Sequence, residues 1–179
     1  MNLPAFITPN FITVLRVLFV PVGAYTLFKN GGDDDSWRII AFTLFFIVGL
    51  SDILDGKIAR SRNQITEFGK LLDPIADKAM LATASIGASI LGMLSWWVTA
   101  IFLIREIAVT ILRFAVIKKG VIPASKGAKL KTFFQNFSVG FYILPLPSYL
   151  NLPRSLFTAV AIYLTITTGV DYFRKVFRK

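Results

Sequence analysis

Residues 52–77 read DILDGKIARSRNQITEFGKLLDPIAD and join two strongly apolar segments of the chain. Four aspartates lie inside or beside those segments: Asp52, Asp55, Asp73 and Asp77. An ionisable side chain in a hydrocarbon environment is costly unless it is paired, hydrated or bound to a metal ion. These carboxylates therefore indicate a functional site in a membrane-embedded chain.

The composition also indicates an integral membrane protein. Of the 179 residues, 55% are hydrophobic and 17 are phenylalanine, which exceeds the apolar share of a soluble domain. Windows of about 20 apolar residues can cross a bilayer. They predict an all-α protein with six transmembrane helices, within 11–28, 37–58, 71–91, 95–117, 132–146 and 154–173. We expect a single membrane-embedded catalytic domain over residues 1–179, with Met1–Ile7 as a short interfacial segment and no removable signal peptide.

Charge sets the predicted orientation. Lysine and arginine concentrate in the second and fourth loops and in the C-terminal tail, whereas Asp33, Asp34 and Asp35 occupy the first loop. The positive-inside rule then places both termini and the end of the bundle that carries residues 52–77 on the cytoplasmic side of the cell membrane. The net charge of +10 fits anionic lipid headgroups, and we expect no nucleic acid partner. The chain has no histidine or cysteine, which leaves carboxylates as the metal ligands.

The spacing of the four aspartates predicts a metal site. Residues three or four apart share one face of a helix, so Asp52 and Asp55 form one pair and Asp73 and Asp77 another. Antiparallel neighbouring helices would bring the pairs together, and cations would relieve their repulsion. Oxygen ligands suit Mg²⁺ or Mn²⁺, and two such ions can bridge phosphate oxygens. The alternative is that these acids are solvated helix caps, with Asp73 before Pro74 as a helix start.

The pattern Asp52-x2-Asp55-Gly56-x2-Ala59-Arg60-x8-Gly69-x3-Asp73-x3-Asp77 resembles the signature of the CDP-alcohol phosphatidyltransferases. That resemblance implies six transmembrane helices, a homodimer, a metal pair held by the aspartates, and exchange of the CMP of a CDP-linked substrate for an alcohol. It also implies that Asp77 is the base that deprotonates the attacking hydroxyl. The residues implied to contact the CDP part of CDP-diacylglycerol are Gly56, Arg60, Thr66, Asn10, Phe11, Ile12 and Thr13. Taken alone, Asn10 and Thr13 are typical helix-capping residues.

A second group of residues bears on the acceptor alcohol. Arg105 and Arg113 share the fourth span with one acid, Glu106, which leaves positive charge for an anionic substrate. The basic residues Lys126, Lys129 and Lys131 follow on the same side of the membrane. Together with Thr132 and Gln135 the run resembles the phosphatidylglycerophosphate synthase branch of the family, although Ala128 replaces a common glycine. The alternatives are a structural ion pair at Arg105 and Glu106 and a topology signal in the lysines.

The resemblance implies transfer of the phosphatidyl group of CDP-diacylglycerol to glycerol 3-phosphate, which gives phosphatidylglycerophosphate and CMP. Arg105, Arg113, Lys126, Lys129 and Lys131 are the candidates for the acceptor phosphate. Two alternatives within the family use phosphatidylglycerol or an inositol phosphate as acceptor. A cation transporter is the alternative of a different class, because clustered acids in a membrane also mark ion pathways.

Overall fold

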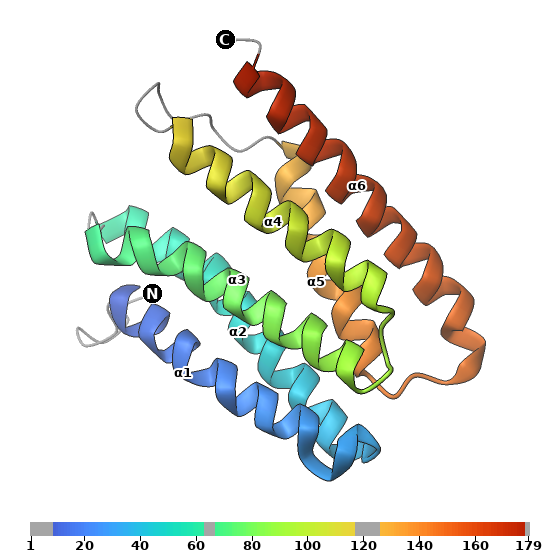
Figure 1. The fold of residues 1–179 in the computed structure, drawn as a ribbon. Helices are drawn as coiled ribbons and strands as arrows, with labels where there is room; N and C mark the ends of the chain where they lie inside the picture. Colours follow the sequence, from blue (N-terminus) through green and yellow to red (C-terminus); the bar gives the residue numbers. More distant parts are fainter. Residues whose placement is uncertain (1–8, 63–66, 117–125, 178–179) are drawn as a thin grey trace. The chain divides into compact units, whose positions relative to one another are not determined.

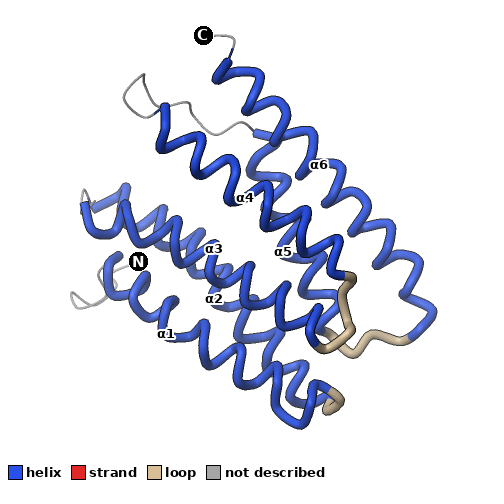
Figure 2. The backbone as a smooth tube through the Cα atoms, in the orientation of Figure 1, coloured by secondary structure: helices blue, strands red, loops and turns tan. Residues whose placement is uncertain are grey.

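The computed structural model describes residues 9–62, 67–116 and 126–177, and the side chains of 17–49, 78–116 and 127–177. Every regular element in those ranges is a helix, as predicted (Figure 2). Thr66 and the predicted interfacial segment Met1–Ile7 lie outside the described residues. The chain divides into two compact units, Met1–Gly87 and Ala88–Lys179, which are described separately. The single catalytic domain over residues 1–179 stays a prediction.

Unit 1 contains α1 (Pro9–Phe28), the 3-10 helix η1 (Lys29–Gly32), α2 (Asp35–Arg62) and most of α3 (Glu67–Ile90). Within this unit α1 and α3 run in the same direction, and α2 runs antiparallel to both (Figure 1). The last turns of α2 and the first turns of α3 therefore lie at one end of the unit, together with the beginning of α1. Because α3 begins at Glu67, Asp73 lies within the helix and not at its start.

The chain reverses between α1 and α2 in a left-handed turn. Asn30 and Gly31 have φ values of 54° and 69°, a region that glycine and asparagine adopt at little cost. Asp34 then caps α2, since its Oδ1 accepts hydrogen bonds from the backbone N–H groups of Ser36 at 2.9 Å and Trp37 at 3.3 Å. This acid of the predicted outer loop therefore has a structural role.

Glycines allow the helices of unit 1 to approach closely. A Cβ atom at Gly23 on α1 would lie 3.0 Å from the ring of Phe45 on α2. A Cβ atom at Gly87 on α3 would lie 2.8 Å from Cδ2 of Leu27 on α1, whose side chain is fully buried. Small residues at helix contacts are typical of packed membrane helices.

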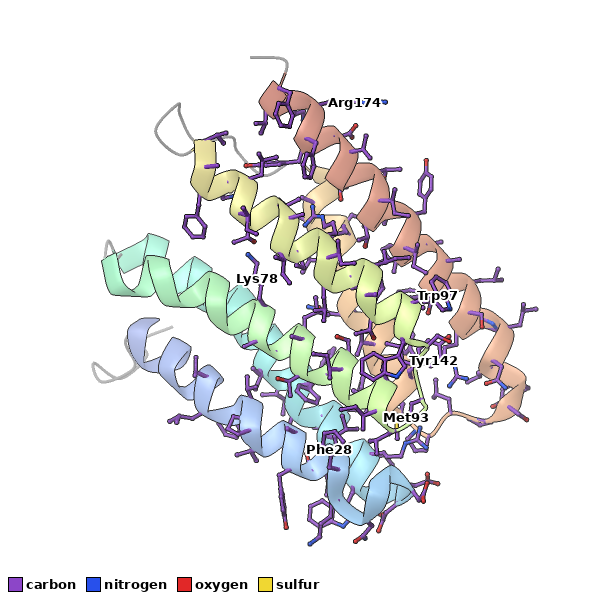
Figure 3. The ribbon with its side chains drawn as sticks, viewed as in Figure 1. Phe28, Lys78, Met93, Trp97, Tyr142 and Arg174 are labelled. Atoms are coloured by element: carbon purple, nitrogen blue, oxygen red, sulfur yellow. The ribbon has the colours of Figure 1, made fainter. Side chains whose placement is uncertain are left out.

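Unit 2 contains the end of α3, α4 (Trp96–Val116), α5 (Lys126–Ile143), the 3-10 helix η3 (Ser148–Leu150) and α6 (Asn151–Phe177). Helix α6 packs against both α4 and α5. Helices α4 and α6 run in the same direction and α5 runs opposite to them (Figure 1). Trp97 and Tyr142 consequently lie toward one end of the unit and Arg174 toward the other (Figure 3).

Two hydroxyl pairs connect the elements of unit 2. Ser138 on α5 and Thr158 on α6 form a buried hydrogen bond of 2.8 Å. Ser89 at the end of α3 and Thr99 on α4 form another of 2.7 Å. Between them the chain turns at Gly92, whose φ of 70° again favours glycine. Pairing each hydroxyl with another satisfies polar groups that would be costly if buried alone.

The structure tests the predicted membrane spans in part. Among the described residues, one helix is long and apolar enough to cross a bilayer by length and composition, Ser148–Phe177. It contains the sixth predicted span. The other five predicted windows overlap α1, α2, α3, α4 and α5, but the fifth, 132–146, runs past the end of α5 at Ile143 into non-helical backbone. The all-helical character is confirmed for the described residues, and the six membrane crossings stay a prediction.

Candidate active site

The four predicted metal ligands lie on two helices of unit 1. Helix α2 carries Asp52 and Asp55 within one turn of each other, and α3 carries Asp73 and Asp77 one turn apart. The two segments lie at the same end of the unit (Figure 1). The side chains of all four residues lie outside the described side chains, so their ligand roles stay predictions.

The donor set fits a hard divalent cation, because α2 and α3 supply carboxylates there and the chain has no histidine or cysteine. Among the side chains that the structure describes, no group of three or more acidic, histidine or cysteine residues is close enough to hold a metal ion. The four aspartates are not among these side chains.

The predicted CDP contacts belong to the same end of unit 1. Asn10, Phe11, Ile12 and Thr13 lie in the first turns of α1, and Gly56 and Arg60 lie in the last turns of α2. Their side chains are outside the described set, and Thr66 is outside the described residues altogether. The helices thus bring these segments to the aspartate-bearing end, while each contact stays a prediction.

Unit 2 contains a buried charged group that we call the Glu106 cluster, composed of Arg105, Glu106, Lys131 and Thr168. Arg105 donates from Nη1 to Oε1 of Glu106 at 3.0 Å and from Nη2 to Oγ1 of Thr168 at 3.3 Å. Lys131 on α5 donates from Nζ to the same Oε1 of Glu106. The cluster therefore joins all three long helices of unit 2.

The Glu106 cluster is largely buried and contains two cations and one carboxylate. The side chains of Arg105, Glu106 and Lys131 are 14%, 15% and 3% exposed. One carboxylate is shared by two cations, so the cluster has a formal charge of one positive unit. Buried ionic groups are costly unless they are paired, so the contacts among these three residues matter for the stability of unit 2.

Arg105 and the nearby Gln135 of α5 contain buried polar atoms that have no hydrogen-bond partner in the part of the chain that the structure describes. Within the described residues, Nε of Arg105 and both amide atoms of Gln135, Oε1 and Nε2, are buried and have no hydrogen-bond partner. Gln135 is 1% exposed and lies one turn after Lys131 on the buried face of α5. Buried polar atoms are nearly always paired in native proteins, so these atoms call for a physical explanation.

The structure brings together two of the five residues predicted for the acceptor phosphate, Arg105 and Lys131. Arg113 is exposed near the end of α4, and its guanidinium lies 6.0 Å from the ring of Tyr172 on α6. Lys129 is exposed on α5, and Lys126 begins that helix with a side chain outside the described set. Roles for these three residues remain predictions.

Two residues of the cluster environment were not predicted from the sequence. Thr168 accepts a hydrogen bond from Arg105, and Gly169 lies against the same side chain, with a Cβ position 3.3 Å from Cγ of Arg105. The only local signal is a small-residue run, Thr167-Thr168-Gly169, in an otherwise apolar helix. Such runs mark close helix approach in general and do not identify the partner.

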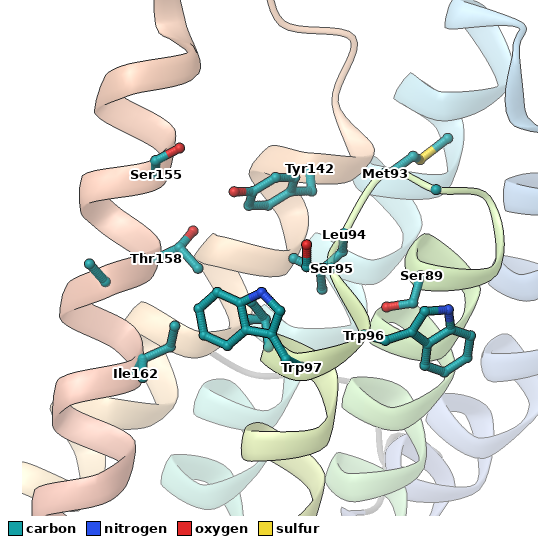
Figure 4. Close-up of a pocket in the computed structure, with 13 residues that line it drawn as sticks. Ser89, Met93, Leu94, Ser95, Trp96, Trp97, Tyr142, Ser155, Thr158 and Ile162 are labelled. Atoms are coloured by element: carbon teal, nitrogen blue, oxygen red, sulfur yellow. The ribbon is translucent and has the colours of Figure 1, made fainter.

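A cavity of about 560 Å³ opens at the other end of unit 2, near the start of α4 (Figure 4). Trp97, Tyr142, Thr158 and Ile162 face it from three helices. The residues that line it include none of the predicted site residues and no charged side chain. The cavity therefore shares no lining residue with the candidate site.

Comparison with known proteins gives a family and close relatives. The family model for CDP-alcohol phosphatidyltransferase matches residues 6–170. The chain is 47% identical over 169 residues to a Mycobacterium tuberculosis protein named probable phosphatidylglycerophosphate synthase, covering 94% of this chain and 81% of that protein. It is 34% identical over 171 residues to the CDP-diacylglycerol–glycerol-3-phosphate 3-phosphatidyltransferase of Rickettsia typhi, covering 93% and 94% of the two chains.

Solved structures of one Mycobacterium tuberculosis enzyme, phosphatidylinositol phosphate synthase, share the fold. The apo form matches with a TM-score of 0.69 at 21% identity, over 96% of this chain and 90% of that chain. The same enzyme with CDP-DAG bound gives a TM-score of 0.65, over 96% and 87% of the chains. Its complex with manganese and citrate gives 0.64, over 96% and 83%. At this level of identity the likeness concerns the fold alone.

Proposed function

The chain belongs to the CDP-alcohol phosphatidyltransferase family, and from this membership we propose that it makes phosphatidylglycerophosphate. The enzyme transfers the phosphatidyl group of CDP-diacylglycerol to glycerol 3-phosphate and releases CMP. The observation that carries this function is the identity of 47% and 34% to relatives named for that reaction, over 94% and 93% of this chain. The family and the activity predicted from the motif are therefore confirmed.

The four aspartates of α2 and α3 would hold the metal ions. Asp52, Asp55, Asp73 and Asp77 supply the oxygen ligands that Mg²⁺ and Mn²⁺ prefer, and the spacing suits two ions. When bound, such ions neutralise diphosphate charge and stabilise the charge that develops on the leaving group. The manganese complex of the structural neighbour supports the use of a divalent metal.

The residues around the aspartates would bind the nucleotide part of CDP-diacylglycerol. Arg60 offers a planar fork for phosphate, and Gly56 permits close approach of the ligand to α2. The first turn of α1, with Asn10 and Thr13, would add nucleotide contacts, and the predicted contacts of Phe11, Ile12 and Thr66 complete this set. The structural neighbour solved with CDP-DAG bound supports this substrate.

Asp77 would act as the general base. It takes the proton of the terminal hydroxyl of glycerol 3-phosphate, whose oxygen attacks the phosphorus attached to diacylglycerol. The new P–O bond forms as the P–O bond to CMP breaks, and Arg60 stabilises the departing phosphate. Asp77→Asn would keep the size of the side chain and remove its basicity.

The acceptor phosphate would bind at the Glu106 cluster. The cluster contains two cations, and Arg105 and Lys131 both carry donors suited to phosphate oxygens. The exposed Arg113 and Lys129, with Lys126, would attract the acceptor from solution before it binds. Binding of an anionic acceptor would account for the excess of basic over acidic residues on α4 and α5.

The bilayer would supply the lipid substrate. We infer that α1 to α6 cross the cell membrane with both termini and the aspartate-bearing end of the helices on the cytoplasmic side, and that the enzyme is a homodimer in contact with membrane lipids. The cysteine-free chain allows a direct test of orientation. A membrane-impermeant maleimide should label Asp33→Cys in intact cells and label Arg174→Cys only after permeabilisation, and the reverse pattern would refute the orientation. Cross-linking in membranes would test the dimer.

The decisive test of the function is CMP release by the purified protein with CDP-diacylglycerol and a panel of acceptors. Glycerol 3-phosphate should support turnover, whereas phosphatidylglycerol and inositol phosphate should not. Asp77→Asn should lose turnover by at least about a hundredfold, within the usual contribution of a general base. Normal turnover by Asp77→Asn would refute the assigned base, and preference for another acceptor would refute the assigned product.

A further inference from the structure

Gln135 is the most completely buried polar side chain near the Glu106 cluster that lacks hydrogen bonds. It is 1% exposed, and both Oε1 and Nε2 are without a partner within the part of the chain that the structure describes. A buried carboxamide with no hydrogen bonds destabilises a protein, since it has lost its contacts with water. A ligand that pairs with both atoms would remove this cost in the bound state.

The position of Gln135 connects it to the acceptor site. It lies one helical turn after Lys131 on α5, and both side chains are almost completely buried, so they share the inward face of that helix. One turn further, Ser138 on the same face bonds to Thr158 of α6. Along this face, Lys131 is paired to Glu106, Gln135 has no hydrogen-bond partner among the described residues, and Ser138 is already hydrogen-bonded to Thr158.

The hydrogen-bonding capacity of the Gln135 carboxamide limits which ligand groups can pair with it. Nε2 donates hydrogen bonds and is satisfied by any oxygen acceptor, including a phosphate oxygen. Oε1 only accepts, so it requires a donor, and a phosphate dianion has none. A hydroxyl next to the phosphate would supply this donor. Glycerol 3-phosphate has such a group, the secondary hydroxyl at C2, between its phosphate and the primary hydroxyl that attacks.

We propose that Gln135 is a specificity residue that recognises the C2 hydroxyl of the acceptor alcohol, with Oε1 accepting a hydrogen bond from that hydroxyl and Nε2 donating one to another oxygen of the same molecule. The proposal rests on the proposed function, because it assumes that the acceptor phosphate binds to Arg105 and Lys131. Under this proposal two groups of the enzyme recognise different parts of the acceptor. The Glu106 cluster selects the phosphate, and Gln135 selects the polyol.

Two acceptors separate this role from a structural one. Glycerol 3-phosphate and 3-hydroxypropyl phosphate both carry a phosphate and a primary hydroxyl, and they differ only in the C2 hydroxyl. The measured quantity is the ratio of kcat/KM for the two acceptors, with CMP release as the readout. The wild-type enzyme should prefer glycerol 3-phosphate by at least about tenfold, as expected when a site leaves a buried polar group unpaired with the poorer substrate.

Three variants complete the experiment. Gln135→Met keeps the side-chain length without polar atoms and should reduce the preference to less than about threefold, because kcat/KM falls more for glycerol 3-phosphate than for 3-hydroxypropyl phosphate. Gln135→Glu keeps an oxygen that accepts from a hydroxyl and should retain the preference. Asn136→Ala removes the neighbouring, half-buried amide on α5 and should leave the ratio unchanged.

The outcomes are distinct. A wild-type enzyme that does not discriminate between the two acceptors, or a Gln135→Met variant that discriminates fully, overturns the role of Gln135. A structural role would lower kcat/KM for both acceptors by the same factor and would leave the ratio unchanged, which also overturns it. Failure of the wild-type enzyme to release CMP with glycerol 3-phosphate would instead refute the proposed function. If Gln135→Met does not fold, Gln135→Leu, which also lacks polar atoms, takes its place with the same expected and contradicting ratios.

Discussion

Gly169 on α6 lies against Arg105 on α4, so that a Cβ atom at residue 169 would stand 3.3 Å from Cγ of the arginine. Arg105 reaches both Glu106 and Thr168 from this position. The absence of a side chain at residue 169 is therefore part of what holds the guanidinium in the Glu106 cluster.

Replacing Gly169 with valine should displace Arg105 and weaken binding of the acceptor phosphate. We expect KM for glycerol 3-phosphate to rise about threefold to tenfold, or about 0.7–1.4 kcal/mol, which is the net contribution of one ordinary hydrogen bond. Turnover at saturating acceptor should change less. Val170→Leu is the matched control, because it adds bulk at the next position, where the side chain is 43% exposed. An unchanged KM in Gly169→Val would contradict this account.

Glu106 and Lys131 should show strong energetic coupling. Glu106→Gln removes the carboxylate that Arg105 and Lys131 share, and removal of one partner from a buried ion pair costs about 3–5 kcal/mol. Lys131→Met alone leaves one arginine and one carboxylate in balance, so its cost should be smaller. The double variant should be more stable than the sum of the single effects predicts, by at least about 1 kcal/mol.

Thermal unfolding in detergent would measure this cycle, and CMP release would measure its effect on function. Lys131→Met should lower kcat/KM for glycerol 3-phosphate at least about tenfold, because the proposed charged donor to the acceptor phosphate is removed. Strictly additive stabilities would show that the contact between Lys131 and Glu106 is not important for folding.

The prediction of helices from apolar windows succeeded, and it failed at helix ends for a physical reason. The fifth window begins at Thr132, yet α5 begins at Lys126, and the second window ends at Ile58, yet α2 ends at Arg62. Hydropathy detects the part of a helix that avoids water. Backbone hydrogen bonds continue through lysine and arginine, which are good helix formers, so the polar turns are missed.

The parts of the candidate site that depend on the spacing of nearby residues along the sequence could be predicted. The four aspartates follow helical spacing within 26 residues, so their pairing on two helices could be derived. Arg105 and Lys131 were identified by charge. Thr168 and Gly169 were not, because their role depends on how close α6 lies to α4, which no local pattern encodes.

Unit 1 should be sensitive to added volume at Gly87. A Cβ atom there would lie 2.8 Å from Cδ2 of Leu27, so Gly87→Val should destabilise the protein by about 1–3 kcal/mol through overpacking. Leu27→Ala should rescue part of this loss in the double variant, although alone it leaves a cavity. Unfolding midpoints in detergent would measure both effects. If Gly87→Val and the double variant lost the same stability, the overpacking would not involve Leu27.

Metal removal should stop the reaction. Treatment with EDTA should abolish CMP release, and either Mg²⁺ or Mn²⁺ should restore it, because oxygen ligands accept both ions. Asp55→Asn should raise the metal concentration required for half-maximal rate, while Asp35→Asn, at the first residue of α2, should not. Activity that persists after exhaustive chelation would exclude the proposed metal role.

Arg105 and Lys131 donate to the same oxygen of Glu106, and this shared contact should restrict which substitutions can be accepted during evolution. Losing the acid leaves two like charges together, and losing one cation alters the charge offered to the acceptor. Each of the three positions constrains the other two. Related enzymes that keep this acceptor should therefore retain the trio together, and a natural change at one position should be accompanied by a change at another.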